Sequence, residues 1–268
     1  MEAGRARDAA LGSIKARIAS KIRVGIQNGD YSPGDALPST STLATVENAA
    51  AMTVRSAYEQ LISEGLVVAV PRKGYFVREP MMMTWFMNAW QDPARLDILP
   101  IDAWTADVEA AGYRGRQEIS LGIVGAEHRV ADHPLADLLD LEENDRVAVR
   151  WRTRYISGKS GEEPESVANS YYPFSLVKDS DICSDRSVNT AVVLKQLGAG
   201  LSRYVDELTP RIATAEEALR LQLPASTAAL DLVRIGITAA GRRVLVQHMI
   251  RPGRGSKFVY HVTYPENP

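Results

Sequence analysis

The strongest constraint on the fold lies in the first eighty residues, where three helical patterns lead directly into a short β-hairpin pattern. Apolar residues recur at three- and four-residue intervals from Leu11 to Ile26, with lysine and arginine between them, which predicts an amphipathic helix. The pattern ends at Asn28-Gly29-Asp30. The Pro33-Gly34 pair then predicts a turn, because proline restricts the backbone and glycine permits a positive φ.

Two more helices are predicted after this turn. Ser39 is placed as the N-cap of a short helix that runs through Leu43 and Ala44. This helix breaks at Glu47-Asn48, where asparagine tolerates a left-handed conformation. A third helix is predicted over Met52–Glu64, and Gly65 follows it.

The hairpin pattern consists of two short strands, Leu66–Val70 and Gly74–Val77, joined by the basic segment Pro71-Arg72-Lys73. Three helices with a tight turn between the last two, followed by a hairpin with cations at its tip, form the layout that places one helix in the major groove of DNA. The sequence therefore predicts a winged helix-turn-helix. The candidate DNA-binding residues are Ser39, Ser41, Met52, Thr53, Arg55, Ser56, Arg72, Lys73 and Gly74.

Several of these residues also have a purely structural interpretation. Arg55 can be a solvated surface arginine, Thr53 can cap the third helix, and Arg72 and Lys73 can be ordinary hairpin charges. Gly74 serves a tight hairpin in either interpretation. The charge distribution favours the DNA-binding interpretation. Residues 1–80 carry 10 Lys and Arg against 8 Asp and Glu, a net +2, whereas the remainder carries 21 against 25, a net −4.

The first eighty residues resemble the DNA-binding domain of the GntR family of bacterial transcription regulators over nearly their whole length. The residues that carry the resemblance are Gly29, Pro33-Gly34-Asp35, Leu37-Pro38-Ser39, Leu43-Ala44, Thr53-Val54-Arg55, Ala57, Leu61, Glu64-Gly65-Leu66 and Gly74–Val77. Two positions depart from the family pattern. Thr40-Ser41 stands where Glu-Arg is usual, and Ala50-Ala51 stands where Ser-Arg is usual. Because the family's arginines at these positions contact DNA, the departures predict a divergent operator or a lower affinity.

Composition excludes several classes of protein. The chain has 268 residues, of which 45% are apolar and 24% charged, as in soluble globular proteins. Its single cysteine, Cys183, excludes an intramolecular disulfide and a cysteine-based zinc cage within one chain. No apolar run reaches the roughly 18 to 20 residues needed to cross a bilayer, and no signal peptide is recognisable. We therefore expect a cytoplasmic protein with no membrane partner.

We expect a DNA-binding domain over residues 1–79, a linker over 80–97 and a second domain over 98–268. The linker is unusually apolar, with Met81-Met82-Met83 followed by Trp85-Phe86. Such a run is expected to pack against one of the domains or against a partner subunit.

The second domain alternates strand-like and helical patterns. The predicted strands are Glu118–Val124, Arg146–Ile156, Val167–Tyr172, Leu201–Leu208, Leu230–Thr238, Arg243–Arg251 and Lys257–Tyr264. The predicted helices are Leu135–Leu139, Val188–Leu197 and Thr214–Leu221. Short turns such as Ala239-Ala240-Gly241 join several strands, so an α+β fold with a largely antiparallel sheet is expected.

Arg152 and Arg154 lie two residues apart on a predicted strand, so both side chains point to the same face of the sheet. Together they can clamp a carboxylate or a phosphate. The alternative is a pair of exposed sheet arginines bridged to Asp or Glu.

The second domain resembles the UTRA domain, the effector-binding half of the HutC subgroup of GntR regulators. The residues that carry this resemblance are Arg152-Thr153-Arg154, Ser170–Pro173, Ile212–Ala215 and Arg234. It implies a chorismate-lyase-like fold, a small-molecule pocket and a dimer formed through these domains. The candidate effector-binding residues are Arg152, Arg154, Ser170, Tyr171 and Arg234. An acid that the family often shows before the Ser-Tyr segment is replaced by Val167 or Ala168, and an acidic loop, Gly161–Glu165, precedes it. This disfavours an amino-sugar ligand.

Nothing in the sequence points to catalysis, a cofactor or a metal. His128, Asp132 and His133 match no familiar set of metal ligands, and neither a Gly-x-Ser-x-Gly elbow nor a phosphate-binding glycine loop is present. The hypothesis is a homodimeric repressor that binds double-stranded operator DNA and responds to a small anionic metabolite. The alternatives are a ligand-binding or interaction protein whose DNA-binding head has decayed, and a lyase-like enzyme suggested only by fold analogy.

Overall fold

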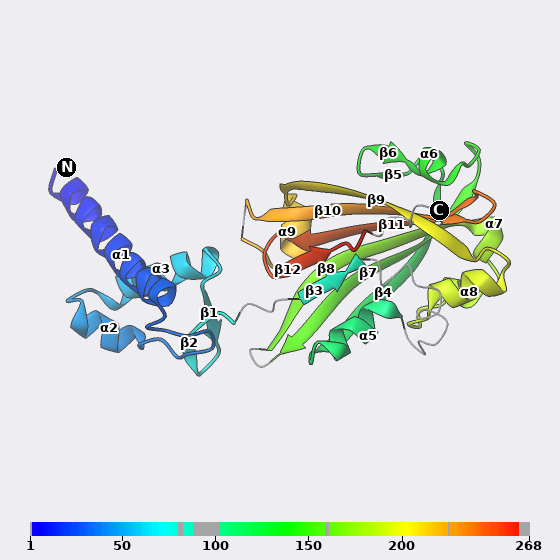
Figure 1. Ribbon diagram of the computed structural model, residues 1–268. Coiled ribbons are helices and arrows are strands. Elements are labelled where there is room, and N and C mark those ends of the chain that lie inside the picture. Colours follow the sequence, from blue (N-terminus) through cyan, green and yellow to red (C-terminus); the bar gives the residue numbers. More distant parts are fainter. Residues whose placement is uncertain (1, 80–82, 88–101, 159–160, 225, 263–268) are drawn as a thin grey trace. The chain divides into compact units, whose positions relative to one another are not determined.

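The computed structural model describes residues 2–79, 83–87, 102–158, 161–224 and 226–262 (Figure 1). The chain divides into two compact units, Met1–Pro80 and Met81–Pro268, here called the head and the body. Much of the expected linker, residues 80–82 and 88–97, lies outside the described residues, as do 98–101 and 263–268 of the expected second domain.

The head contains three helices and a hairpin, as expected. The elements are α1 (Glu2–Asn28), α2 (Thr40–Val46), α3 (Ala51–Ser63), β1 (Val67–Val70) and β2 (Gly74–Val77). Ser39 caps α2 as predicted, because its side-chain oxygen accepts a hydrogen bond from the Thr42 amide at 3.1 Å. The N-cap of α3 is Ala50, whose side chain makes no capping bond.

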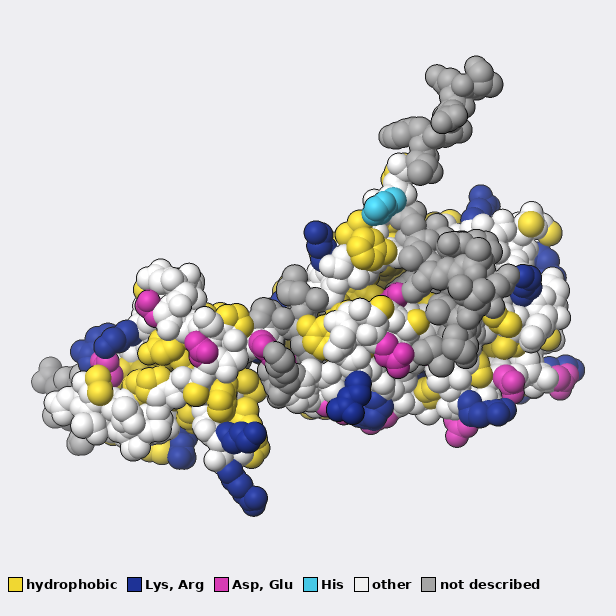
Figure 2. All heavy atoms as spheres, turned by 60° about the horizontal axis from the view of Figure 1, so that its bottom comes forward, with side chains coloured by type: hydrophobic (Ala, Val, Ile, Leu, Met, Phe, Trp, Pro, Cys, Tyr) yellow, Lys and Arg dark blue, Asp and Glu magenta, His cyan; other side chains and the backbone are white. Residues whose placement is uncertain are grey.

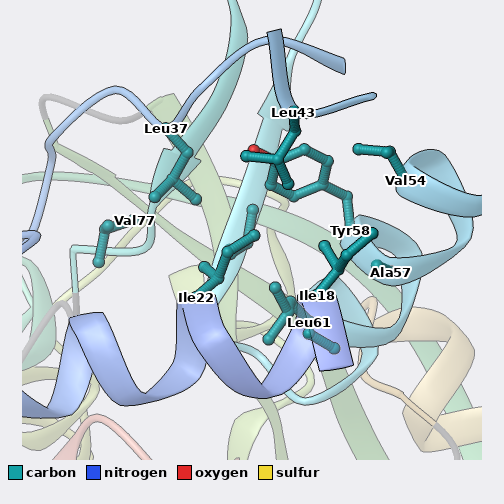
Figure 3. Packing of buried hydrophobic residues seen from close by; sticks show 11 residues of the cluster. Ile18, Ile22, Leu37, Leu43, Val54, Ala57, Tyr58, Leu61 and Val77 are labelled. Carbon is teal, nitrogen blue, oxygen red and sulfur yellow. The ribbon is translucent and has the colours of Figure 1, made fainter. Parts of the chain in front are cut away.

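The head core forms where α1, α2, α3 and the hairpin meet (Figure 3). From α3, Val54, Tyr58 and Leu61 point into it at helical spacing. The α1 residues Ile18 and Ile22 face them and are also buried. Because the inward residues of α3 are set by this core, its other face is left to solvent.

The body is built on a six-stranded sheet in which every neighbouring pair is antiparallel, in the order β4-β7-β8-β11-β10-β9. The strands are β4 (Arg114–Gly125), β7 (Arg146–Gly158), β8 (Gly161–Pro173), β9 (Leu201–Ile212), β10 (Ala228–Thr238) and β11 (Arg243–Pro252). The prediction of an α+β fold with a mostly antiparallel sheet is therefore confirmed. Each of these strands overlaps a predicted strand.

Both faces of the sheet are covered. On one face, Val147 and Val149 of β7 pack with α6 (Leu135–Leu139). On the other, the intervening residues of β7 face α5 (Ala103–Ala110), α7 (Phe174–Val177), the short helix η2 (Asp181–Cys183) and α8 (Thr190–Gln196). Figure 1 shows α6 on one side of the sheet and α5 and α8 on the other. Helix α9 (Ala215–Arg220) begins with a capping box formed by Thr214 and Glu217.

Part of the expected linker belongs to the core of the body. Strand β3 (Met83–Phe86) pairs in parallel with β12 (Ser256–Val259), which falls where the last strand, Lys257–Tyr264, was predicted. Met83, Trp85 and Met87 are buried, with at most 3% of their surface exposed. Two further strands of two residues each, β5 (Arg129–Val130) and β6 (His133–Pro134), pair with each other.

The acidic segment Gly161–Glu165 was predicted as a loop but forms the first part of β8. Strand β11 pairs only with Val167–Tyr171 of β8, so the acidic segment has a partner strand, β7, on one side only. Pro164, which lacks an amide donor, is tolerated at such an edge. The proline and the charges made this strand unrecognisable from the sequence.

Candidate DNA interface and effector site

The N-terminal turns of α3 present the residues expected to read DNA. Met52 is 66% exposed and Arg55 is also exposed, whereas Thr53 and Ser56 are half-buried. Val54, which lies between them in the sequence, is buried in the core of the head. Because Val54 fixes which side of α3 faces the core, these residues lie toward the outer side of the helix.

Ser39 and Ser41 lie at the start of α2, on the exposed surface of the head. The Ser39 hydroxyl is engaged in capping and lies 2.9 Å from the Ser41 hydroxyl and 2.8 Å from the Thr42 hydroxyl. Ser39 therefore has a structural role in α2 that is independent of DNA.

The tip of the hairpin is exposed from Pro71 to Gly74. The Lys73 amide donates to the Val70 carbonyl at 3.0 Å, closing a turn in which Arg72 has φ of 63°. With Pro71 before it, Arg72 occupies the position where a type II turn favours glycine. A cation is thus held at the tip at the expense of backbone strain.

Several cations of α1 are already engaged within the head. Lys21 Nζ lies 2.7 Å from Glu47, and Arg17 contacts the same carboxylate. Arg23 donates two hydrogen bonds to Glu64, at 2.9 and 2.6 Å. Figure 2 shows lysine and arginine side chains in several separate groups, with acidic side chains between them. Arg55, Arg72 and Lys73, the cations expected to bind DNA, are exposed.

The body buries five arginines on the sheet face that carries α5 and α8, here called the arginine face. They are Arg150, Arg152 and Arg154 of β7, Arg234 of β10 and Arg251 of β11. Each is at most 6% exposed. Residues two apart on a strand share a face, which accounts for the three from β7.

A cavity opens on the arginine face and brings together three of the predicted effector residues, Arg152, Arg154 and Arg234. The other lining residues include Asp102 and Trp104 from the start of α5, Tyr204 of β9 and Gln247 of β11. The volume of the cavity is about 70 Å³. At about 10 to 15 Å³ for each water, this corresponds to roughly five to seven waters.

Arg152 is held by neutral oxygens. Its Nε donates to the Ala168 carbonyl at 2.9 Å, and its Nη2 donates to the Ser170 hydroxyl. Burial lowers the pKa of Arg152, because its charge is taken out of water. No carboxylate contacts this guanidinium among the described residues.

Arg154 lies with its guanidinium 5.0 Å from the centre of the Trp104 ring, and its Nε donates to Gln117 at 3.2 Å. Burial, followed by the positive charge of Arg152, lowers the pKa of Arg154. Among the carboxylates, Asp102 has the largest opposing effect and raises the pKa of Arg154. Although burial raises its pKa, the charge of Arg154 and several hydrogen bonds give a net lowering of the pKa of Asp102.

Arg234 differs because a carboxylate holds it. Both oxygens of Asp206 accept from Arg234, each at 2.6 Å, in a bidentate pair whose side chains are 1% and 7% exposed. The Tyr204 ring lies 4.8 Å from the same guanidinium. Arg234 is thus fixed at the cavity wall with its charge already balanced.

Comparisons with known proteins match both units of the chain. A family model described as "Bacterial regulatory proteins, gntR family" matches residues 14–77, and a model of the UTRA domain matches residues 115–254. The chain belongs to the GntR family. This GntR chain is a DNA-binding transcription regulator with a UTRA effector-binding domain. The chain is similar to regulators rather than enzymes, as expected.

Relatives of this GntR regulator match both of its units. It is 28% identical over 250 residues to an uncharacterized HTH-type transcriptional regulator of Streptomyces coelicolor, covering 91% of this chain and 89% of the relative. It is 24% identical over 228 residues to the mannosyl-D-glycerate transport/metabolism system repressor MngR of Escherichia coli, covering 84% and 86%. The solved structure of PhnF from Mycobacterium smegmatis has a similar fold, with a TM-score of 0.56 at 18% identity over 94% of this chain and 100% of that chain.

Two of the predicted effector residues, Ser170 and Tyr171, do not meet at the cavity of this GntR regulator. Neighbouring residues on a strand point to opposite faces, so only Ser170 faces Arg152. Tyr171 lies in the hydrophobic cluster with α6, and its ring centre is 5.8 Å from that of His128. Neither residue lines the cavity directly.

Sequence reasoning missed Asp102, Trp104, Tyr204, Asp206 and Gln247. Of these, only Asp102 left a local signal, because its carboxylate caps α5 by accepting from the Thr105 amide at 3.2 Å. The others join the site through strand order and register, which no local pattern reveals. Among the residues that the structure describes, no cluster of His, Cys, Asp and Glu is arranged to hold a metal ion. In the same residues, no helix is long and apolar enough to cross a membrane.

Proposed function

We propose that this regulator is a repressor of the HutC subgroup that acts in the cytoplasm and releases its operator when a small anion occupies the cavity. The observation that carries the proposal is an excess of buried positive charge. Of the five buried arginines, Arg234 and Arg251 pair directly with carboxylates. Within the part of the chain that the structure describes, Arg150 and Arg152 donate hydrogen bonds to neutral oxygens only. An anion at the cavity would balance charge that the protein leaves uncompensated.

The state of Asp102 narrows the class of anion. Its carboxylate accepts hydrogen bonds from the Thr105 amide and hydroxyl, from Gln117 and from Ser187. With these donors in place, it is poorly able to bind a ligand ammonium group. The proposed effector therefore carries a carboxylate or phosphate and no amine, with Arg152, Arg154 and Arg234 as its cationic contacts.

The head is proposed to bind operator DNA through α3 and the hairpin tip. Thr53, Arg55 and Ser56, together with the exposed Met52, are suited to base edges in the major groove. Arg72 and Lys73 are suited to phosphates or the minor groove, with Gly74 allowing the turn. Ser41 is proposed as a further contact at the start of α2, and Ser39 as one that also caps it.

A homodimer through the bodies is part of the proposal. Both edge strands of the sheet carry exposed large apolar side chains, Leu121 and Ile123 on β4 and Val205 and Leu208 on β9. Apolar edges of this kind favour pairing with a second chain. A two-fold dimer would be mirrored in a palindromic operator. Repression is supported by the name of the relative MngR, and the effector would act by binding one arrangement of the dimer better than another.

The proposal is tested with a fluorescent duplex drawn from the protein's own promoter region and with an extract of anionic metabolites. We expect sequence-selective binding that the extract weakens, and an Arg152→Met variant that still binds DNA but no longer responds. Arg242→Ala, at an exposed arginine in the turn between β10 and β11, outside the cavity and the edge strands, is the control. Normal metabolite binding with no operator binding at low salt would instead favour a ligand-binding protein with a decayed head.

A further inference from the structure

A series of contacts leads from the cavity to strand β3. The first is made by Trp104, which lines the cavity and lies against the guanidinium of Arg154. Its indole Nε1 donates to Glu165 Oε2 at 3.2 Å. Trp104 is only 2% exposed, so its ring has little freedom to move without disturbing Glu165.

Glu165 is the next member of the series. Its Oε1 accepts from Arg251 Nη1, and its Oε2 also accepts from the Ser166 hydroxyl at 2.6 Å. The side chains of Arg251 and Glu165 are 2% and 9% exposed. Away from water the electrostatic attraction between these two charged groups is strong. The loss of one donor to Glu165 therefore changes the strength of its remaining hydrogen bonds.

Arg251 carries the series to β3. Its guanidinium lies 3.9 Å from the centre of the Trp85 ring, and Trp85 is fully buried in β3. Strand β3 begins four residues after Glu79, the last described residue of the head. It is therefore the first described element of the body that the chain forms after leaving the head.

We propose that Trp104, Glu165 and Arg251 couple occupancy of the cavity to the stability of β3, with Glu165 and Arg251 as positioning residues that transmit a shift of Trp104 to Trp85. The inference rests on the effector site proposed above. An anion that draws Arg154 toward itself changes the contact between Arg154 and Trp104. The indole then shifts, Glu165 loses a donor, and the stacking of Arg251 on Trp85 is altered. Coupling through packed polar networks of this kind is typically modest.

Two glycines of β4 provide a matched steric test. A methyl group at Gly115 would lie 2.8 Å from Trp104 Cζ3, so Gly115→Ala must displace the indole. A methyl group at Gly122 would lie 2.3 Å from Trp151 Cη2. Gly122→Ala therefore makes the same change in the same strand against a tryptophan outside the series. Neither substitution removes a charge or a hydrogen-bonding side chain.

The experiment is hydrogen exchange of residues 83–87 in the full chain. We expect Gly115→Ala to accelerate exchange in β3 by about 2- to 30-fold and Gly122→Ala to leave it unchanged within error. Trp104→Phe keeps a ring but removes the donor to Glu165, so it should also accelerate exchange. Glu165→Gln should do the same, and the double variant Trp104→Phe/Glu165→Gln should match Glu165→Gln alone. Equal effects of the two glycine variants, or an unchanged β3 in Trp104→Phe, would overturn the coupling.

Inorganic phosphate separates this inference from the proposed function. Calorimetry should show binding that Arg152→Met abolishes and Glu165→Gln retains. Phosphate should change β3 exchange in the natural chain but not in Glu165→Gln. Binding that survives Arg152→Met would refute the effector site, while the glycine and Trp104 variants would still decide the coupling. Binding to the natural chain without any change in β3 would overturn the coupling alone.

Discussion

The head carries its candidate DNA-binding cations on the surface, whereas the body buries five arginines on one face of its sheet. Arg55, Arg72 and Lys73 of the head are solvated, so they add little to folding and remain available to phosphates and bases. The buried arginines of the body have lost their water, and each must find oxygens within the fold. In the proposed function, cationic side chains attract DNA over long range in the head and bind an anion selectively in the body.

The largest effect that would test this contrast is expected from Asp206→Ala, which leaves Arg234 buried without its carboxylate. Breaking a buried pair in this way costs about 3 to 5 kcal/mol of folding free energy. All four tryptophans follow residue 80, so urea unfolding monitored by tryptophan fluorescence reports on the body. The double variant Asp206→Ala/Arg234→Met should recover most of the loss. A loss below about 1 kcal/mol would show that the arginine face tolerates unpaired charge.

Arg55→Ala is expected to have the next largest effect, and it should appear in binding alone. If Arg55 reads a base, specific operator affinity falls by about 1 to 3 kcal/mol. Because the side chain is exposed, urea unfolding of the head, followed by far-ultraviolet circular dichroism of its helices, should not change. Fluorescence anisotropy with specific and scrambled duplexes measures the first quantity. An affinity equal to that of the natural chain would assign Arg55 to the solvated surface.

Arg72→Gly should separate backbone strain from charge at the hairpin tip. Glycine relieves the positive φ of 63°, which stabilises the hairpin by about 1 kcal/mol. The same change removes a cation, so DNA binding should weaken. Slower hydrogen exchange in β1 and β2 together with weaker binding is the expected result. Arg72→Ala removes the charge without relieving the strain and is the control. Identical exchange rates in the two variants would show that the backbone at Arg72 is not strained.

Lys73→Ala is expected to have the smallest effect. Losing one phosphate contact should reduce the slope of log affinity against log salt by about 0.9, with similar weakening on every duplex. Arg152→Met, which removes a buried cation of the body, should leave that slope unchanged. Titrations over a series of salt concentrations measure both. A changed slope in Arg152→Met would mean that the body also contacts DNA.

Much of the head could be predicted from the sequence because its signals are local. The helical period of α3 separates the buried Val54 and Tyr58 from the exposed Arg55, and the Ser39 cap lies beside the helix it begins. In the body, the two-residue spacing of Arg152 and Arg154 correctly placed both on one face. The periodicity of the sequence is sufficient to predict which residues of one helix or strand share a face.

Tertiary structure alone decided what surrounds those arginines. Asp206 meets Arg234 because β9 and β10 pair in a particular register, and Glu165 meets Arg251 because the acidic segment continues β8. Tyr171 faces away from the cavity although its neighbour Ser170 faces Arg152. Both faces of the sheet are covered, so alternation of apolar residues could not show which face would hold the site. The sequence by itself determined which residues share a face, and strand order and register determined which distant residues that face would meet.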